Sequence, residues 1–272
     1  MVRLIAVDLD GTLLDGRNRI AGRSIRILQK ALDMGIYVVP ATGRCIGLLP
    51  KELQALVGLR YAVTENGALT WDFQKEQEWR RISLPPDQAA AVLKLTGGMN
   101  AYAEVFCHGQ AYADIRCLDG IERSALGGNF IRYFTEDHNF LRDLDREWKL
   151  LSEAEKVNLY FADSSDAERV RRCLETDRSI SVSTSIGGNV EVAAAGADKG
   201  RALGELADML LVDRKDILAF GDNENDLGMF KIAGTAVAMG NAGETIRAAA
   251  DFVAGTNDEL GAAIFLEKIL NV

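Results

Sequence analysis

The chain has 272 residues, of which 48% are hydrophobic and 26% are charged. These proportions are those of a folded globular protein, and the length suffices for one large domain or two of ordinary size. The formal net charge of -9 argues against a nucleic-acid partner, because binding to a phosphate backbone requires clustered lysine and arginine. The charge fits a monomer or a small homo-oligomer.

The chain lacks the features of an exported or membrane-bound protein. Met1 leads directly into VRLIAVDLDG, without the basic and apolar regions of a signal peptide. Apolar runs are far shorter than the roughly 20 residues that cross a bilayer. We therefore expect a cytoplasmic protein with no membrane partner. Because the cysteines form no CxxC pair and stand beside no histidine at ligand spacing, we expect free thiols at Cys45, Cys107, Cys117 and Cys173.

The first predicted elements alternate between strand and helix. Residues 2–7 are a β-branched run that ends in Asp, Gly and Thr, which is typical of a buried parallel strand. Apolar residues at helical spacing from Ser24 to Leu32, followed by Gly35 as a stop, predict an amphipathic helix. Residues 36–42 then predict a second strand, so the chain begins as an α/β fold.

The middle of the chain has a different pattern. Hairpin signals occur at 108–110 and 187–189, and residues 156–163 resemble a strand. We expect residues 84–188 to form an inserted domain, with Pro85-Pro86 and Gly187-Gly188 as linkers. Its two histidines have no further ligand at zinc spacing, so we expect surface or partly buried side chains at His108 and His138.

Strand and helix alternate again toward the C-terminus. Asp198 is a good N-cap for a helix over residues 198–211, which places Lys199 at the helix start. A strand from residue 216, a helix after Asn223 and a strand at TAVAMG follow. We expect a doubly wound, Rossmann-like parallel sheet in a core of residues 1–83 and 189–272, with a smaller α/β (α+β) cap inserted.

The strongest local signal is the sequence DLDGTL, which begins at Asp8 and directly follows the first predicted strand. Ligands bind at this end of the strands in parallel α/β sheets. Asp8 and Asp10 would repel each other in a tight loop, and Mg²⁺ is the ion that suits such carboxylates. An ordinary Asp-Gly turn explains the same residues equally well when they are taken alone.

A second acidic group, at Asp222 and Asp226 in GDNEND, also follows a predicted strand. Its position favours metal binding, although Asp222 and Asn223 could serve as helix caps instead. Thr42 and Gly43 end another strand and could hold phosphate oxygens. Lys199 could add a fixed positive charge. Their common alternatives are a turn hydroxyl for Thr42 and a solvated helix surface for Lys199.

Four motifs follow one another in a specific order: DLDGT at 8–12, ATGR at 41–44, Lys199 in DKG, and GDNENDLGMF at 221–230. This set resembles the motifs of the haloacid dehalogenase superfamily of phosphatases, specifically its Cof-like branch, subfamily IIB, with a C2B cap. ENGA at 65–68 and NAGETIRAAADFV from 241 also resemble the family pattern, although Asn66-Gly67 fits a hairpin turn too. The match spans nearly the whole chain and is weakest in the cap.

The resemblance implies a phosphatase that hydrolyses a small phosphorylated metabolite, such as a sugar phosphate, through an aspartyl-phosphate. Asp8 is then the nucleophile, and Asp10 exchanges protons with the leaving alcohol and the attacking water. Mg²⁺ is the implied cofactor, held by Asp8, the Asp10 backbone carbonyl and Asp222, with Asp226 orienting its waters. The implied phosphate-binding residues are Leu9, Thr42, Gly43, Lys199 and Asn225.

Other functions fit the same motifs. A phosphomutase uses similar residues but returns the phosphoryl group to a sugar, and a sugar-specific hydrolase differs only in its substrate. A non-enzymatic sensor of a phosphorylated metabolite is possible because a fold alone does not establish catalysis. The sequence lacks the GxxxxGK[ST], GxGxxG, GxSxG and HExxH motifs of other enzyme classes.

Overall fold

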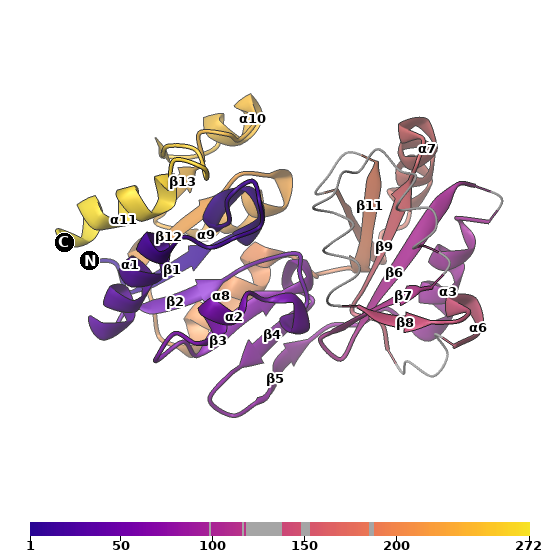
Figure 1. Ribbon diagram of the computed structural model, residues 1–272, viewed down its shortest axis with the longest axis horizontal. Helices are drawn as coiled ribbons and strands as arrows, with labels where there is room; N and C mark the ends of the chain where they lie inside the picture. The colour runs from indigo at the N-terminus through magenta and orange to yellow at the C-terminus, as the bar shows by residue number, and fades with distance from the viewer. Residues whose placement is uncertain (98, 116, 118–137, 148–152, 185–187) are drawn as a thin grey trace. The chain divides into compact units, whose positions relative to one another are not determined.

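The computed structural model describes residues 1–97, 99–115, 117, 138–147, 153–184 and 188–272. The chain divides into two compact units (Figure 1). The first unit comprises residues 1–44, 49–80 and 198–272, and the second comprises residues 45–48 and 81–197.

The first unit is built on a parallel five-stranded sheet in the order β14-β13-β12-β1-β2. Its strands are β1 (Leu4–Val7), β2 (Tyr37–Pro40), β12 (Ile217–Gly221), β13 (Thr235–Ala238) and β14 (Phe252–Val253). The strands β1 and β12 are buried along their whole length, as expected for central strands that are covered on both faces.

Helices cover both faces of this sheet (Figure 1). The helices of this unit are α1 (Gly22–Asp33), α2 (Lys51–Gln54), α8 (Lys199–Met209), α9 (Leu227–Ile232), α10 (Glu244–Ala248) and α11 (Gly261–Leu270). Leu4 and Ala6 share a core with α8, α9 and α10. Phe220 of β12 instead meets Phe265 of α11, with ring centroids 5.6 Å apart, and α1 packs beside α11.

The first unit also contains a smaller sheet in the order β3-β4-β5, with β3 (Tyr61–Thr64), β4 (Leu69–Asp72) and β5 (Gln77–Arg81). Residues 65–68 join the antiparallel strands β3 and β4. Asn66 and Gly67 have positive φ angles of 55° and 93°, so the predicted turn is present. Thr42 N donates to Val63 O at 2.9 Å, which ties this sheet to the end of β2.

The second unit is a six-stranded sheet in the order β10-β11-β9-β6-β7-β8. Its strands are β6 (Ala101–Cys107), β7 (Gln110–Asp114), β8 (Asn139–Leu141), β9 (Lys156–Phe161), β10 (Ile180–Ser183) and β11 (Asn189–Ala194), and its helices are α3 (Pro86–Lys94), α6 (Leu144–Glu147) and α7 (Ser164–Leu174). The pairs are antiparallel except β7 with β8. Alternate residues of β9 and β11, such as Val157 and Val192, join the apolar core beneath α3 and α7.

The predicted α/β class is confirmed: a parallel core sheet accompanies a separate cap of mixed sheet and helices. We call residues 45–48 and 81–197 the cap unit. The domain bounds predicted at 84 and 188 remain a proposal. Pro85 and Pro86 begin α3 inside the cap unit instead of linking two domains, since proline suits the first helical turn. Gly188 lies in the turn before β11, and Gly187 falls outside the described residues.

The predicted hairpin at residues 108–110 is present between β6 and β7. As expected, His108 is exposed and His138 is partly buried as a residue, although the His138 side chain itself is fully buried. Its Nε2 lies 2.8 Å from Glu104 Oε1, and this partner permits the burial. The four cysteines are free thiols, as predicted. No helix within the described ranges combines the length and the apolar character needed to cross a membrane.

Candidate active site

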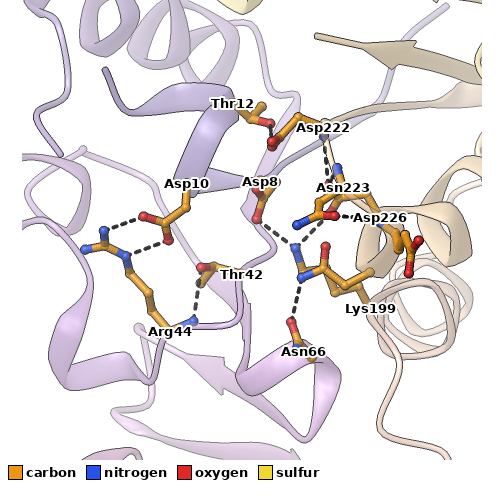
Figure 2. Close-up of polar contacts among 12 residues, drawn as sticks. Asp8, Asp10, Thr12, Thr42, Arg44, Asn66, Lys199, Asp222, Asn223 and Asp226 are labelled. Atoms are coloured by element: carbon orange, nitrogen blue, oxygen red, sulfur yellow. Dashed lines mark hydrogen bonds and ion pairs between the residues drawn. The ribbon is translucent and has the colours of Figure 1, made fainter. Parts of the chain in front are cut away.

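Three neighbouring strands of the core sheet deliver polar side chains to one edge. Asp8 follows β1, Thr42 follows β2, and Asp222 follows β12. The strands are parallel, so their carboxyl ends meet, which is where α/β folds bind ligands. Figure 2 shows these side chains converging with Lys199 from the start of α8.

Lys199 is fully buried, so the alternative interpretation of this residue as part of a solvated helix surface is wrong. Its ammonium donates to Asp8 Oδ1 at 2.7 Å and to Asp226 Oδ1 at 2.7 Å (Figure 2). The predicted N-cap explains how it gets there: Arg201 N donates to Asp198 Oδ1 at 2.7 Å and fixes the first turn of α8. Lys199 thus joins the loops after β1 and β12 by charge-assisted hydrogen bonds.

The loop after β12 is organised by Asp226. Its Oδ2 accepts from the backbone N–H groups of Asp222 at 2.9 Å and Asn223 at 3.1 Å. Asn223 in turn caps the short helical turn that follows, accepting from Glu224 N at 2.8 Å. The capping alternative is therefore correct for Asn223, and Asp226 completes this cap. The side chain of Asp222 is not a cap: it accepts from the Thr12 hydroxyl at 2.8 Å.

Gly11 allows the loop after β1 to approach Asp222. Its φ angle is +79°, and a Cβ atom at this position would lie 2.3 Å from Asp222 Oδ2. A larger residue would therefore be strained in its backbone and would collide with the carboxylate. The sequence motif names this glycine, but only the structure shows which side chain it makes room for.

Electrostatic interactions in the site favour an additional cation. Burial raises the pKa of the Asp8 carboxyl well above its usual range, Lys199 opposes this, and Asp226 and Asp222 add to it. Burial also raises the pKa of Asp222 to about 6, against the hydrogen bond from Thr12. Burial alone would lower the pKa of Lys199, but Asp226 and Asp8 raise it overall. Ionised, these three carboxylates carry more charge than Lys199 neutralises.

The arrangement can hold a metal ion. Asp8, Asp222 and Asp226 each offer a carboxylate oxygen, and these atoms all lie within 4.8 Å of one another. An oxygen-only donor set of this kind suits Mg²⁺. Asp226 already uses both oxygens on Lys199 and the loop backbone, so Asp8 and Asp222 are the better candidates for direct ligands.

Asp10 points away from this group and pairs with a residue that sequence reasoning left without a role. Arg44 donates from Nε to Asp10 Oδ2 at 2.8 Å and from Nη2 to Asp10 Oδ1 at 2.5 Å (Figure 2). The Asp10 side chain is 50% exposed and that of Arg44 only 12%. Arg44 is the last residue of the ATGR motif, directly after Thr42-Gly43. This position in the motif is the sequence feature that could have identified Arg44 as a site residue.

The expected phosphate-binding residues have different surroundings. Thr42 is buried, and its hydroxyl accepts from Arg44 N at 3.1 Å, which is the turn role considered for it. Leu9 has a fully buried side chain, so it can offer only its backbone, as Gly43 does. Asn225 Nδ2 donates to Asn66 Oδ1 at 3.0 Å, so its described partner is Asn66 and not Lys199.

Comparisons with known proteins place this geometry among hydrolases. The family described as haloacid dehalogenase-like hydrolase matches residues 5–266. A 5-amino-6-(5-phospho-D-ribitylamino)uracil phosphatase of Bacillus subtilis (strain 168) is 28% identical over 96% of this chain and 93% of its own length. A pyridoxal phosphate phosphatase of Escherichia coli (strain K12) is 28% identical over 97% of each chain.

Solved structures agree with these relatives. A haloacid dehalogenase-like hydrolase from B. subtilis superposes with a TM-score of 0.84 at 26% identity, covering 98% of this chain and 99% of that chain. The similarity therefore includes both the core and the cap unit.

Proposed function

Because this chain belongs to the haloacid dehalogenase-like hydrolase family, we propose that it hydrolyses a small phosphorylated metabolite through an aspartyl-phosphate on Asp8, with Mg²⁺ as cofactor. The chain is a phosphoric monoester hydrolase with a family-typical metal site, and its relatives are phosphatases of small metabolites. The observation that carries the proposed aspartyl-phosphate mechanism is the buried contact of Asp8 with Lys199, at 2.7 Å, beside the carboxylate of Asp222.

In the first half-reaction, an Asp8 oxygen attacks the phosphorus while the bond from phosphorus to the ester oxygen breaks. Asp10 gives its proton to the departing alcohol. In the second, a water molecule gives a proton to Asp10 and attacks the phosphorus, and the bond to Asp8 breaks to release inorganic phosphate. Asp8 is supported as the nucleophile by its place at the end of β1. Asp10 is supported as the acid and base because its carboxyl group is half-exposed and lies two residues after Asp8.

Mg²⁺ would be held by Asp8, Asp222 and the backbone carbonyl of Asp10, with Asp226 acting through bound water. When bound, it would offset the negative charge that Asp8 and the phosphate bring together. The fit is supported by the carboxylate oxygens of Asp8, Asp222 and Asp226, which lie within 4.8 Å of one another. The pKa of Asp222 is raised first by burial and then by the negative charges of Asp226 and Asp10, and a cation would offset those charges.

The chain's own groups stabilise the phosphoryl group during transfer. Lys199 supplies a positive charge that burial keeps strong, since the low local dielectric limits screening. The Thr42 hydroxyl and the backbone N–H groups of Leu9 and Gly43 supply donors. Asn225, whose side-chain amide donates to Asn66, is proposed as a further polar residue of the phosphate-binding group.

The substrate belongs to the class of small phosphomonoesters, and we propose that the chain acts on it in the cytoplasm as a monomer or small homo-oligomer. Neither nucleic acid nor membrane is a proposed partner. A phosphomutase would use the same residues, but the two relatives described above are phosphatases. A sensor without catalysis is disfavoured because Asp8 and Asp10 are both present and Asp8 contacts Lys199.

A screen of phosphorylated metabolites with and without Mg²⁺ tests the proposal. Sugar phosphates, flavin-type phosphates and pyridoxal phosphate form the panel, and release of inorganic phosphate is measured. We expect release that requires Mg²⁺ and stops on addition of EDTA. Transfer of the phosphoryl group to a second sugar position would indicate a mutase, and binding without turnover of any ester would indicate a sensor.

A further inference from the structure

Arg44 is a direct partner of Asp10. Its guanidinium holds both carboxylate oxygens, at 2.8 Å and 2.5 Å, in the two-pronged geometry that fixes a carboxylate in direction as well as distance. The Arg44 side chain is only 12% exposed although Asp10 is 50% exposed. The partner of the solvent-facing carboxylate is therefore itself held by the protein.

The backbone of Arg44 is anchored within the first unit. Its N–H donates to the Thr42 hydroxyl at 3.1 Å, and its carbonyl accepts from Glu65 N at 2.9 Å. Asn66 N donates to Thr42 O at 3.0 Å. These bonds link Arg44 to the turn that follows β3 and to the proposed phosphate-binding residue Thr42.

The four residues after Arg44 pack within the cap unit, although the chain on either side of them belongs to the core. Cys45 and Leu48 are buried in an apolar cluster with Phe106 and Ala111 of the β6–β7 hairpin. Gly47 N donates to Gly109 O at 3.0 Å. The cap unit thus takes in a short segment that begins one peptide bond after Arg44.

Gly47 is closely fitted to that hairpin. A Cβ atom at position 47 would lie 3.1 Å from Gln110 Nε2 and 3.3 Å from Gly109 O, closer than ordinary contact. The segment is therefore packed against the hairpin and does not merely pass near it.

We propose that Arg44 is a positioning residue that sets the direction of the Asp10 carboxylate and couples it to the cap unit through residues 45–48. This inference rests on the proposed role of Asp10 in proton transfer. A half-exposed aspartate without such a partner would sample several rotamers in water. The peptide bond between Arg44 and Cys45 directly connects the residue that holds Asp10 to the segment packed in the cap unit.

The first test replaces Arg44 and compares two kinds of leaving group. The kcat/KM value covers only the steps up to alcohol release, so it reports the half-reaction in which Asp10 gives up its proton. An aliphatic ester from the substrate screen needs this proton, whereas p-nitrophenyl phosphate has a leaving group stable as an anion. For Arg44→Gln we expect kcat/KM to fall about 100-fold on the aliphatic ester and less than about threefold on p-nitrophenyl phosphate.

The matched control is Arg19→Gln. Arg19 makes two hydrogen bonds to Asp15, at 3.2 Å and 2.9 Å, on the exposed surface of the same unit. Its loss should therefore leave kcat/KM unchanged on both esters. Asp10→Asn defines the full effect of losing the proton donor, and Arg44→Lys should recover part of the activity on the aliphatic ester. Equal losses of Arg44→Gln on both esters would overturn the inference, because they would indicate substrate binding or misfolding instead.

The second test addresses the coupling to the cap unit. Leu48→Ala removes a buried side chain from the cluster that holds residues 45–48, and Leu174→Ala removes one from α7, at similar exposures of 5% and 7%. We expect Leu48→Ala to lower kcat/KM on the aliphatic ester, relative to kcat/KM on p-nitrophenyl phosphate, by roughly three- to tenfold. Leu174→Ala should leave the ratio of these two kcat/KM values unchanged. The same ratio in both variants would refute the coupling.

These outcomes separate the inference from the proposed function. If the wild-type chain hydrolyses no phosphate ester, the proposed function fails first. If the wild type is active and Asp10→Asn discriminates between the esters but Arg44→Gln does not, only the role of Arg44 is rejected.

Discussion

The ammonium of Lys199 lies 2.7 Å from the carboxylate of Asp8, and no part of the Lys199 side chain is exposed to solvent. A buried ion of either sign is unfavourable without its partner, so each residue depends on the other. The same ammonium binds Asp226 at 2.7 Å, which extends this dependence to the loop after β12.

Lys199→Met is expected to abolish turnover and to destabilise the metal-free protein by about 3–5 kcal/mol, because Asp8 and Asp226 would remain buried without their cation. Urea unfolding in EDTA measures this loss, and Mg²⁺ should restore part of it by replacing the missing charge. Lys215→Met is the control, since that lysine forms an exposed pair with Asp213. Equal stability of the Lys199 variant and the wild type would contradict the buried network.

Much of the fold was predictable because it follows from local patterns. The short apolar runs at 2–7 and 216–220 and the helical spacing around Ile27 indicated alternating strands and helices. The observed elements differ from the predicted bounds by one or two residues: β1, for example, begins at Leu4 and not at residue 2. The hairpin at 108–110 was also indicated by its glycine.

Packing between distant residues was not predictable in the same way. Residues 45–48 join the cap unit because Cys45 and Leu48 meet Phe106 and Ala111, and no local pattern specifies that contact. The pair of Asp10 with Arg44 is similar: an arginine after a strand usually points into solvent, and its partner lies 34 residues earlier. The contact of Asp8 with Lys199, by contrast, was indicated by the motifs, which place both residues at the ends of elements of the core.

Asp8→Asn is expected to abolish phosphatase activity while leaving the fold intact, because the amide cannot form the aspartyl-phosphate. Rapid quenching followed by mass spectrometry should find one phosphoryl group on Asp8 in the wild type and none in the variant. Asp15→Asn, a surface change in the same unit, should keep full activity. Turnover by the Asp8 variant at the wild-type rate would rule out this residue as the nucleophile.

Gly11→Ala is expected to lower kcat at least about 100-fold, because the loop must shift to separate the new methyl group from Asp222. The added atom would otherwise lie 2.3 Å from Asp222 Oδ2, so the affinity for Mg²⁺ should fall as well. Activity measured over a range of Mg²⁺ concentrations distinguishes the two effects. Gly243→Ala is the matched control, since nothing lies within 4 Å of the position its Cβ would take. A Gly11 variant with normal kinetics would show that the loop can move freely.

Asp222 makes the stability of the metal-free protein depend on pH. Its pKa is raised from the ordinary 3.8 to about 6, so between these values the folded protein retains a proton that the unfolded chain has released. Protonated Asp222 therefore contributes stability below about pH 4, and this contribution is lost as the pH rises to about 6. The unfolding free energy of the wild type in EDTA, relative to that of Asp222→Asn, should accordingly fall across this range.

Mg²⁺ should reverse this trend, because only the deprotonated carboxylates can bind it. The rise in melting temperature on adding Mg²⁺ should be small at pH 5, large at pH 7 and weak at both values in Asp222→Asn. Asp15 supplies a control of opposite sign: desolvation acts to raise the pKa of its carboxyl, but the hydrogen bonds from Arg19 and Arg17 together outweigh it and lower that pKa. Its contribution is present above the unfolded pKa and is lost as the pH falls. A Mg²⁺ effect independent of pH would show that Asp222 does not take part in binding the ion.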